Sequence, residues 1–354
     1  MDLKPIVLLS NRYGRNPAFV LAGGGNTSVK EGDVMYVKAS GTRLATITED
    51  GFVPVRRSGL RATMSKDYPS SDREREAAFL QDVQKARILE NETRRPSVEA
   101  LLHALFPQRY VLHLHPTKLN GLTCGQDGEA AAKRLFGDDI LWIPLCRPGY
   151  ILGKLCFEAM SAFHAKHGKD ADQILLQNHG VFVAGETVDA VEAKFQAICS
   201  AVSAVGIREP ELTPETRMDP ILGARIAGSA GYAAFVQLSG PEFVRLCKDR
   251  RNASPLLRPF TPDHIVACGA YPAWVEDTAD LYDVPGHRFA AVKGIGVFCL
   301  GEDTHSAETV ASLVRDAAGI AAATESFGGP LPMTEDLTDF ITHWEAESYR
   351  RKKF

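Results

Sequence analysis

The stretch "YVLHLHP", Tyr110 to Pro116, indicates a short buried β-strand that carries two histidines. Residues i and i+2 of a strand point to the same face, so His113 and His115 are predicted to converge while the two leucines face the opposite side. Unpaired histidines are costly to bury in such a strand unless something bonds them. Taken alone, the pair fits satisfied core histidines as well as metal ligands.

A third histidine favours the metal interpretation. His179 stands in "LLQNHGVFVAGET", Leu175 to Thr187, which reads as strand, tight turn and strand. Three neutral imidazoles with one open position form a known catalytic zinc arrangement, and imidazole also suits other divalent transition metals. We therefore predict that His113, His115 and His179 bind Zn²⁺ or another divalent transition metal.

A carboxylate precedes this strand. Glu99 lies in "PSVEALLHAL", Pro96 to Leu105, which predicts a helix with Ser97 as its N-cap. The helix dipole favours an acidic residue in the first turn, so Glu99 fits either a helix-stabilising residue or a base beside the metal. His103, one turn later, is interpreted as a packing or supporting residue and not as a ligand.

The surrounding sequence alternates strand-like and helical patterns. Two strands joined through Glu31-Gly32-Asp33 are predicted in Ser28–Ser40, and the strand pattern continues over Thr42–Val55. The charged run Asp72–Arg95 predicts a helix. The segment Arg208–Pro220 is rich in proline and glutamate, which makes it the best candidate linker. We therefore expect two domains, at residues 1–207 and 208–354.

An internal repeat connects these domains. "NHGVFVAGETVDAVEA" from Asn178 resembles "GIGVFCLGEDTHSAET" from Gly294, at a constant offset of 116 residues. Both segments run into an alanine-containing helical pattern, which favours a diverged duplication over a chance match. His179 in the first copy corresponds to Ile295 in the second. If the copies share a fold, only the first keeps the chemistry of that histidine.

Composition excludes several classes of function. The 354 residues are 45% hydrophobic and 24% charged, as in ordinary soluble globular proteins. The net charge of -4 and the lack of a basic stretch make nucleic acid an unexpected partner. No apolar run of about 18 residues and no signal-peptide core are present, so no membrane association is expected. Seven scattered cysteines without a CxxC pair favour reduced thiols and a cytoplasmic location.

Five stretches in order resemble the class II aldolase/adducin family: "GGGNTSVK" (Gly23–Lys30), "KASGT" (Lys38–Thr42), and the three that contain Glu99, His113 and His179. More specifically, the chain resembles the aldolase part of long fusion proteins that join a rhamnulose-phosphate aldolase to a short-chain dehydrogenase. The resemblance covers about residues 8–205, and a weaker one continues to "FITHWEAESYRRKK", Phe340 to Lys353. No glycine-rich βαβ fingerprint of a dehydrogenase is present.

The resemblance implies a fold and a role for each matched residue. The implied fold is α/β, a three-layer α/β/α domain with a largely antiparallel central sheet, followed by a smaller C-terminal α/β domain interpretable as a degenerate duplicate. The three histidines match the family's zinc ligands, and Glu99 matches its catalytic carboxylate. The positions that match phosphate-binding residues are Asn26, Thr27, Ser40, Gly41 and Ser97.

The implied function is that of a zinc-dependent class II aldolase-type lyase of carbohydrate metabolism, acting as a homo-oligomer. It would cleave a ketose phosphate or related sugar by a retro-aldol reaction through a metal-stabilised enediolate. A sugar-phosphate epimerase, a keto-sugar-acid decarboxylase and a non-catalytic adducin-like scaffold are the alternatives. The family commonly has Ser-Ser-Glu where this chain has Ser97-Val98-Glu99, so an unphosphorylated sugar or a sugar acid is also conceivable. Tyr150 is the nearest candidate for the acid.

Overall fold

The computed structural model describes residues 1–89 and 92–346. It divides the chain into two compact units. Unit 1 comprises Met1–Leu119, Glu129–Val202 and Trp344–Phe354, and unit 2 comprises Asn120–Gly128 and Ser203–His343. Residues 90–91 of the predicted charged helix and residues 347–353 of the predicted C-terminal match lie outside the described residues.

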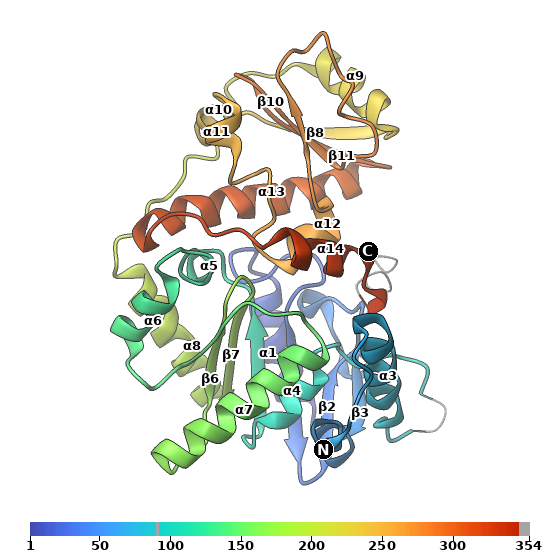
Figure 1. The fold of residues 1–354 in the computed structure, drawn as a ribbon, viewed down its shortest axis with the longest axis vertical. Coiled ribbons are helices and arrows are strands. Elements are labelled where there is room, and N and C mark those ends of the chain that lie inside the picture. Colours follow the sequence, from blue (N-terminus) through green and yellow to red (C-terminus); the bar gives the residue numbers. More distant parts are fainter. Residues whose placement is uncertain (90–91, 347–354) are drawn as a thin grey trace. The chain divides into compact units, whose positions relative to one another are not determined.

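Unit 1 is built on a sheet whose described strands follow the order β3-β2-β1-β4-β7-β6-β5 (Figure 1). The strands are β1 Asn26–Glu31, β2 Val34–Lys38, β3 Phe52–Arg56, β4 Tyr110–Leu114, β5 Leu141–Ile143, β6 Gln173–Leu176 and β7 Gly180–Gly185. Neighbouring strands are antiparallel except β5 and β6, which are parallel. The predicted largely antiparallel sheet is therefore confirmed, and the predicted histidine strand β4 lies in its middle.

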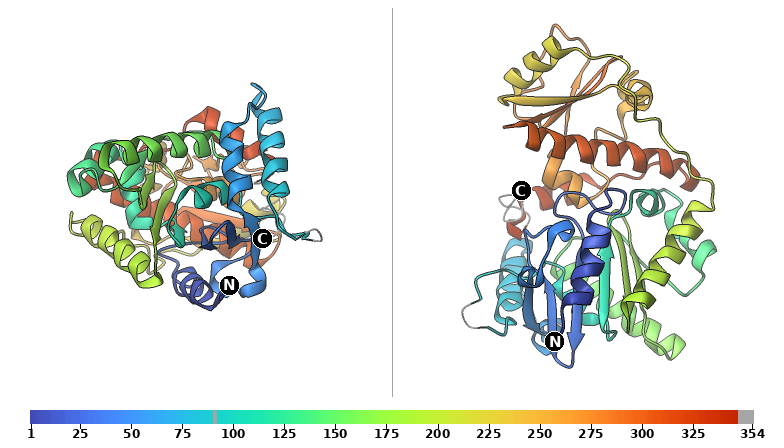
Figure 2. Two further views of the ribbon diagram at one scale, coloured as in Figure 1. Left: turned by 90° about the horizontal axis from the view of Figure 1, so that it is seen from below. Right: turned by 180° about the vertical axis from the view of Figure 1, so that it is seen from behind.

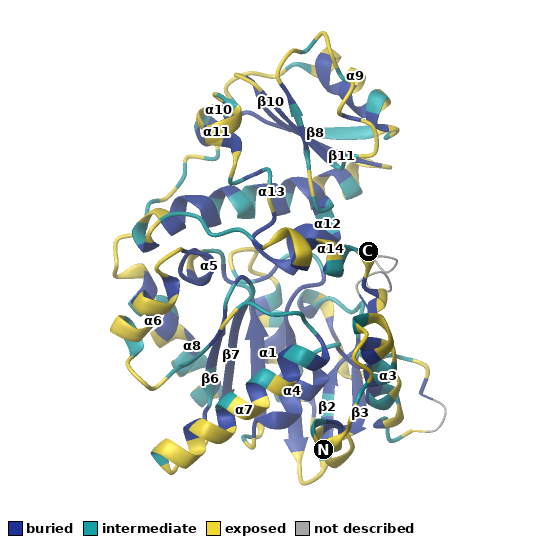
Figure 3. Ribbon diagram, viewed as in Figure 1, coloured by how far each residue is buried: buried dark blue, intermediate teal, exposed yellow. Residues whose placement is uncertain are grey.

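Helices cover both faces of this sheet. The helices are α1 Lys4–Gly14, α2 Arg57–Ala62, α3 Asp72–Lys85, α4 Ala100–Leu105, α5 Thr117–Thr123, α6 Gly128–Phe136, α7 Tyr150–His167 and α8 Val188–Ser203. Helices α4 and α7 lie on one face and α1 and α8 on the other (Figures 1 and 2). Phe195 of α8 packs edge-on against Tyr13 of α1, with ring centroids 5.0 Å apart. The strands between these layers are buried, whereas the outer side of α7 is exposed (Figure 3). The three-layer prediction is thus confirmed.

Two local predictions in unit 1 need correction, and one helix was not predicted. The N-terminal segment forms that helix, α1, whose start is favoured by Pro5 in its first turn. The segment Thr42–Val55 is a strand only from Phe52. Its first part forms short 3₁₀ turns because it packs closely on α1, where Asn11 donates a hydrogen bond to the carbonyl of Ile47.

The helix predicted over Asp72–Arg95 ends at Lys85. Arg87 turns back after that end: its Nε donates to the Gln84 carbonyl at 2.9 Å, and its Nη1 donates to the Glu92 carbonyl. These bonds satisfy backbone carbonyls at and beyond the helix end, which explains why the charged pattern continues without a helix.

Unit 2 is the smaller α/β region that was predicted. Its described strands are β8 Ala234–Leu238, β9 Ala273–Val275, β10 Phe289–Val292 and β11 Gly296–Gly301. Its helices are α9 Pro220–Ala230, α10 Pro241–Leu246, α11 Arg250–Ala253, α12 Pro262–Cys268, α13 Thr304–Thr324 and α14 Glu335–His343. Ile226 and Ala227 of α9 pack on the sheet with Phe298. The predicted linker carries no helix or strand before α9 begins at Pro220.

The sheet of unit 2 repeats half of the sheet of unit 1. The order β8-β11-β10-β9 matches β4-β7-β6-β5, and each pair of neighbours has the same direction in both sheets. A Cβ on Gly180 would lie 2.3 Å from the Leu114 carbonyl oxygen, and a Cβ on Gly296 would lie 2.2 Å from that of Leu238. The strand pairing thus shows the repeat that the sequence predicts.

Candidate metal centre

The central strand β4 and the residue after it supply two of the three histidines. His113 lies in β4, His115 directly follows its last residue, Leu114, and the ring centroids of the two histidines lie 4.7 Å apart. Their Nε2 atoms are 2.9 Å apart. His113 is fully buried. The predicted convergence of these two rings is therefore present in the structure.

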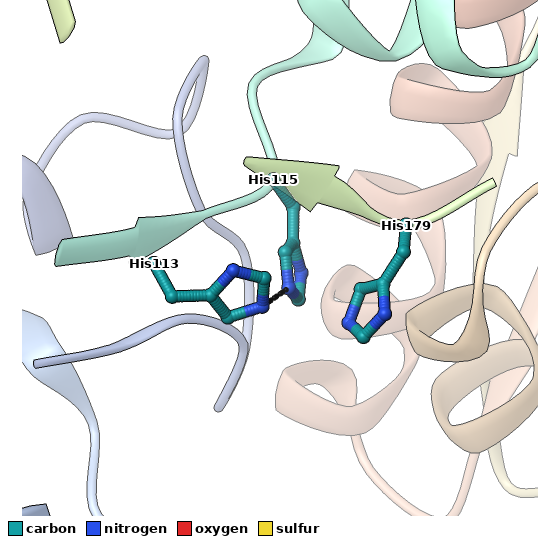
Figure 4. Close-up of side chains that lie close together, drawn as sticks. All are labelled: His113, His115 and His179. Atoms are coloured by element: carbon teal, nitrogen blue, oxygen red, sulfur yellow. Dashed lines mark hydrogen bonds between the residues drawn. The ribbon is translucent and has the colours of Figure 1, made fainter. Parts of the chain in front are cut away.

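The turn between β6 and β7 supplies the third histidine. Asn178 adopts the left-handed conformation with φ +56°, which asparagine tolerates better than most residues. The next ring, that of His179, has its centroid 5.0 Å from that of His113 and 4.9 Å from that of His115. One ring nitrogen of each histidine lies within 4.8 Å of the others. Figure 4 shows the three side chains directed into the same space.

Glu99 completes the cluster from the start of α4. The helix begins at Ala100, so Glu99 occupies the N-cap position and not the first turn. Ser97, predicted as the N-cap, lies two residues earlier, and its hydroxyl accepts a hydrogen bond from the Glu99 N–H at 3.3 Å. Glu99 Oε2 lies 3.3 Å from His113 Nε2, and Glu99 Oε1 lies 3.4 Å from His179 Nε2.

The hydrogen bonds of His113 fix which ring nitrogen is bare. Nδ1 lies 3.0 Å from the carbonyl oxygen of Val181, which only accepts, so Nδ1 carries the hydrogen. Burial lowers the pKa of His113 well below its ordinary value, so the ring is neutral. Its Nε2 therefore presents a lone pair to the Glu99 carboxylate, which also only accepts. Two acceptors face each other at a distance where a cation would bind both.

The carboxylate of Glu99 also has an oxygen that lacks a hydrogen-bond donor. Burial raises the pKa of Glu99, and the hydrogen bond from the Asn26 amide opposes this shift. Asn26 Nδ2 donates to Oε2 at 2.6 Å. Among the described residues, no donor reaches Oε1, which is buried. Three imidazole nitrogens and a carboxylate with an unsatisfied oxygen fit a divalent transition metal.

Ser97 and Ser40 belong to two paired chain segments, and Ser97 contacts Glu99 as described. Ala39 bridges to Pro96 in this pairing, so Ser40 lies opposite Arg95. The Ser40 N–H donates to the Arg95 carbonyl at 2.8 Å, and the Ser97 N–H donates to the Lys38 carbonyl at 2.9 Å. Gly41 follows with φ +82°, a conformation suited to glycine.

The other two predicted phosphate-binding residues have their side chains engaged. Asn26 uses its amide for Glu99 and for His103. Thr27 points to the opposite face of β1, where its hydroxyl lies 2.7 Å from that of Ser10 on α1. A phosphate contact through either side chain stays a prediction.

Sequence reasoning did not single out Lys38. It is buried at the end of β2, and its Nζ lies 3.4 Å from the carbonyl oxygen of Gly23 in the glycine-rich loop. The available signal in the sequence was a lysine at the end of an apolar strand pattern, directly before Ala39-Ser40-Gly41. Tyr150, the candidate acid, lies in the core of unit 1, where its ring packs against Tyr68 with centroids 4.7 Å apart.

Comparisons with known proteins identify the family of the chain. Residues 7–204, more than half of the chain, match the family described as Class II Aldolase and Adducin N-terminal domain. The chain is 29% identical over 201 residues to YuxG of Bacillus subtilis (strain 168), named as an uncharacterized oxidoreductase. This match covers 54% of the chain but 28% of that relative, as expected for a fusion with an oxidoreductase part. Among the helices of the described residues, none has the length and apolar character needed to cross a membrane.

Solved structures show the same likeness. An N-terminal class II aldolase domain from Thermoplasma acidophilum is 28% identical, with a TM-score of 0.49, and the match covers 58% of this chain and 93% of that one. L-fuculose-1-phosphate aldolase from Thermus thermophilus is 16% identical, with a TM-score of 0.35, covering 56% and 93%. The family match spans residues 7–204, the range that contains the strands of the sheet of unit 1, the three histidines and Glu99. The chain belongs to the class II aldolase and adducin family.

Proposed function

We propose that the chain is a metal-dependent lyase that cleaves a ketose phosphate or a related sugar by a retro-aldol reaction. The observation that carries this proposal is the cluster of three imidazole nitrogens within 4.8 Å of one another, with the Glu99 carboxylate 3.3 and 3.4 Å from two of them. Zn²⁺ is the ion we propose, because three histidines with an open position suit it.

The chemistry divides between the ion and the protein. A divalent ion bound by the three histidines would polarise the sugar carbonyl as a Lewis acid and stabilise the charge left on the enediolate. Glu99 is the proposed proton carrier, because Oε2 is held by Asn26 while Oε1 has no donor among the described residues. His113 is held through Nδ1 by the Val181 carbonyl, which keeps Nε2 directed into the site.

The anionic end of the substrate has a separate site in this proposal. Gly23 and Ser40 come from segments that meet beside Glu99, and buried Lys38 adds positive charge next to them. Backbone N–H groups of a glycine-rich loop and a lysine are suited to a phosphate or a carboxylate. Val98 cannot supply the second hydroxyl found in many relatives, so a singly charged carboxylate is a candidate alongside phosphate. Oligomer formation, a cytoplasmic location and a role in carbohydrate metabolism are further expectations from the family.

A substrate screen tests the proposal. The chain would be loaded with Zn²⁺, Mn²⁺ or Co²⁺ and offered ketose 1-phosphates, free ketoses and keto sugar acids, with products identified by mass spectrometry and NMR. We expect two carbonyl products from one ketose. An epimer or carbon dioxide would instead indicate the epimerase or decarboxylase alternative.

The histidine variants make this screen specific for the site. His115→Ala should lower cleavage at least about 100-fold, the scale expected when one charge-stabilising group is lost. His305→Ala, which removes an exposed histidine of α13, is the matched control and should keep full activity. Cleavage that survives His115→Ala undiminished would remove the proposed site. Failure to bind any of the three metals would support the scaffold alternative.

A further inference from the structure

A chain of three hydrogen bonds runs from β1 through α4 to Glu99. His103 of α4 is fully buried, and its Nδ1 lies 2.8 Å from Ser28 Oγ. Its Nε2 bonds to Asn26 Oδ1, and Asn26 Nδ2 donates to Glu99 Oε2 at 2.6 Å. Asn26 and Ser28 share one face of β1, whereas Glu99 and His103 are one turn apart. Hydrogen bonds therefore join β1 both to the helix α4, through His103, and to Glu99 at its N-cap.

The direction of each hydrogen bond follows from the groups involved. Asn26 Nδ2 donates to Glu99 Oε2, so the amide nitrogen of Asn26 faces the carboxylate. The Asn26 carbonyl oxygen then faces His103 and can only accept. His103 Nε2 must therefore carry the ring hydrogen. Because the neutral ring has one hydrogen, Nδ1 is bare and accepts from the hydroxyl of Ser28.

The environment keeps this ring neutral. Burial, aided by the charges of Lys30 and Lys38, lowers the pKa of His103 to about 3. The ring also packs edge-on against Phe182, with centroids 5.4 Å apart. It is thus held in one orientation and one tautomer. Within the described part of the chain, its hydrogen bonds go to Ser28 and Asn26 and not to the three histidines.

We propose that His103 is a positioning residue, which holds the Asn26 amide so that Asn26 keeps Glu99 directed at the three histidines. This inference rests on the proposed function, because it assigns a task to Glu99. Without a donor at the Nε2 position, the Asn26 carbonyl oxygen loses its partner, and the amide is held only through its bond to Glu99. Asn26 and Glu99 could then move together, and the carboxylate would be less firmly aimed at the histidines.

Two substitutions of His103 separate positioning from packing. The amide nitrogen of Gln reaches about as far as His Nε2, whereas that of Asn reaches about as far as Nδ1. His103→Gln can therefore still donate to Asn26, and His103→Asn cannot. We expect kcat to fall about 10- to 100-fold in His103→Asn with KM nearly unchanged, as for other residues that orient a metal-site group. His103→Gln should stay within about threefold of the parent, although both variants lose the ring.

The hydrogen-bond chain can be read without any substrate. Ring-nitrogen NMR of the metal-free chain should show His103 as a neutral Nε2–H ring from pH 5 to 8, assigned by the signals that His103→Gln lacks. The side-chain amide signals of Asn26, assigned with Asn26→Asp, should keep their positions in His103→Gln and move in His103→Asn. A ring with its hydrogen on Nδ1, or Asn26 signals that respond equally to both substitutions, would overturn the proposal.

A double substitution tests the link to Glu99. In a Glu99→Gln background, His103→Asn should cause no further loss of kcat, because the group that it positions is already gone. An independent loss of the same size in that background would contradict the proposal. If no substrate is cleaved by the parent, the proposed function fails, and the NMR comparison of Asn26 in the two His103 variants still decides the positioning role.

Discussion

At the scale of single residues, the site depends on buried rings whose protonation is set by their partners. Phe182 stacks on His113 with centroids 3.9 Å apart, and the Val181 carbonyl holds Nδ1. His103 is fixed on the opposite side of the carboxylate by Ser28 and Asn26. Burial of these two rings disfavours their charged forms and lowers their pKa values. Acid is therefore expected to destabilise the fold through these histidines.

The pH dependence of the free energy of unfolding tests whether His103 stays neutral in the folded chain. The pKa of His103 is about 3 in the folded chain and near 6.5 when exposed, so between these values the unfolded state binds more protons. The free energy of unfolding should therefore fall as pH drops below about 6.5, by up to about 1.4 kcal/mol per pH unit for this group. His103→Gln removes that contribution. Urea unfolding of the metal-free chain at pH 7 and pH 5 should show a smaller difference in the variant, by about 2 kcal/mol.

The comparison contains its own control. His305 is exposed, so His305→Ala should leave the difference between pH 7 and pH 5 unchanged. A His103→Gln variant that is as acid-sensitive as the parent would show that this ring is not kept neutral in the folded chain.

At the scale of elements, the turn between β6 and β7 brings His179 to the end of β4. Gly180 makes this approach possible, because a Cβ there would lie 2.3 Å from the Leu114 carbonyl oxygen and 2.9 Å from His115 Cδ2. A side chain at this position would push the turn away from β4. The close approach of His179 to the other two rings therefore depends on the missing side chain of Gly180.

Gly180→Ala should weaken metal binding as well as the fold. Overpacking of this kind costs about 1 to 3 kcal/mol, and displacement of His179 should weaken Zn²⁺ binding about 10- to 100-fold. Unfolding in urea and a competitive chelator titration would measure the two effects. Gly296→Ala is the matched control, since its Cβ would lie 2.2 Å from the Leu238 carbonyl oxygen. It should lower stability and leave Zn²⁺ affinity unchanged. Equal metal affinity in both variants would contradict the role given to Gly180.

The sequence was sufficient for the elements that carry a clear periodic pattern. The alternation around His113 and the turn at His179 predicted the strand faces and the cluster, because strand geometry alone places i and i+2 together. The sequence did not predict α1. It also did not predict the 3₁₀ turns after Thr42, because tertiary packing against α1 decides the conformation of that segment. The hydrogen-bond chain through His103 was also out of reach. It depends on β1 lying beside α4, residues more than 70 positions apart in the chain.

At the scale of the whole molecule, unit 2 repeats the sheet but replaces the ligands. Gln237 stands opposite Phe298 in β11, as His113 stands opposite Phe182 in β7. By the same register, Ser239 takes the place of His115, and Ile295 takes that of His179. An amide, a hydroxyl and an aliphatic side chain form a poor ligand set for a transition metal.

Residues of the linker form hydrogen bonds with the side chains of Gln237 and Ser239. Gln237 Oε1 accepts from the Asp219 N–H at 2.7 Å, and its Nε2 donates to the Arg217 carbonyl at 2.8 Å. Ser239 Oγ donates to the Glu215 carboxylate at 3.1 Å. The polar groups that correspond to metal ligands are thus satisfied within unit 2 by the segment that precedes α9. The two copies share a framework, and among the described residues only the first copy has a group of histidines that could hold a metal.

Metal stoichiometry should therefore follow unit 1 alone. After dialysis against excess Zn²⁺ and removal of unbound ion, elemental analysis should give about one zinc per chain, because only one three-histidine set is present among the described residues. His115→Ala should reduce this value to a small fraction of one. Gln237→Ala should destabilise unit 2 by about 1 to 3 kcal/mol, since two buried hydrogen bonds lose their partner, and should leave the zinc content unchanged. A second equivalent of zinc that survives His115→Ala and is lost in Gln237→Ala would mean that the duplicate copy has retained a metal site of its own.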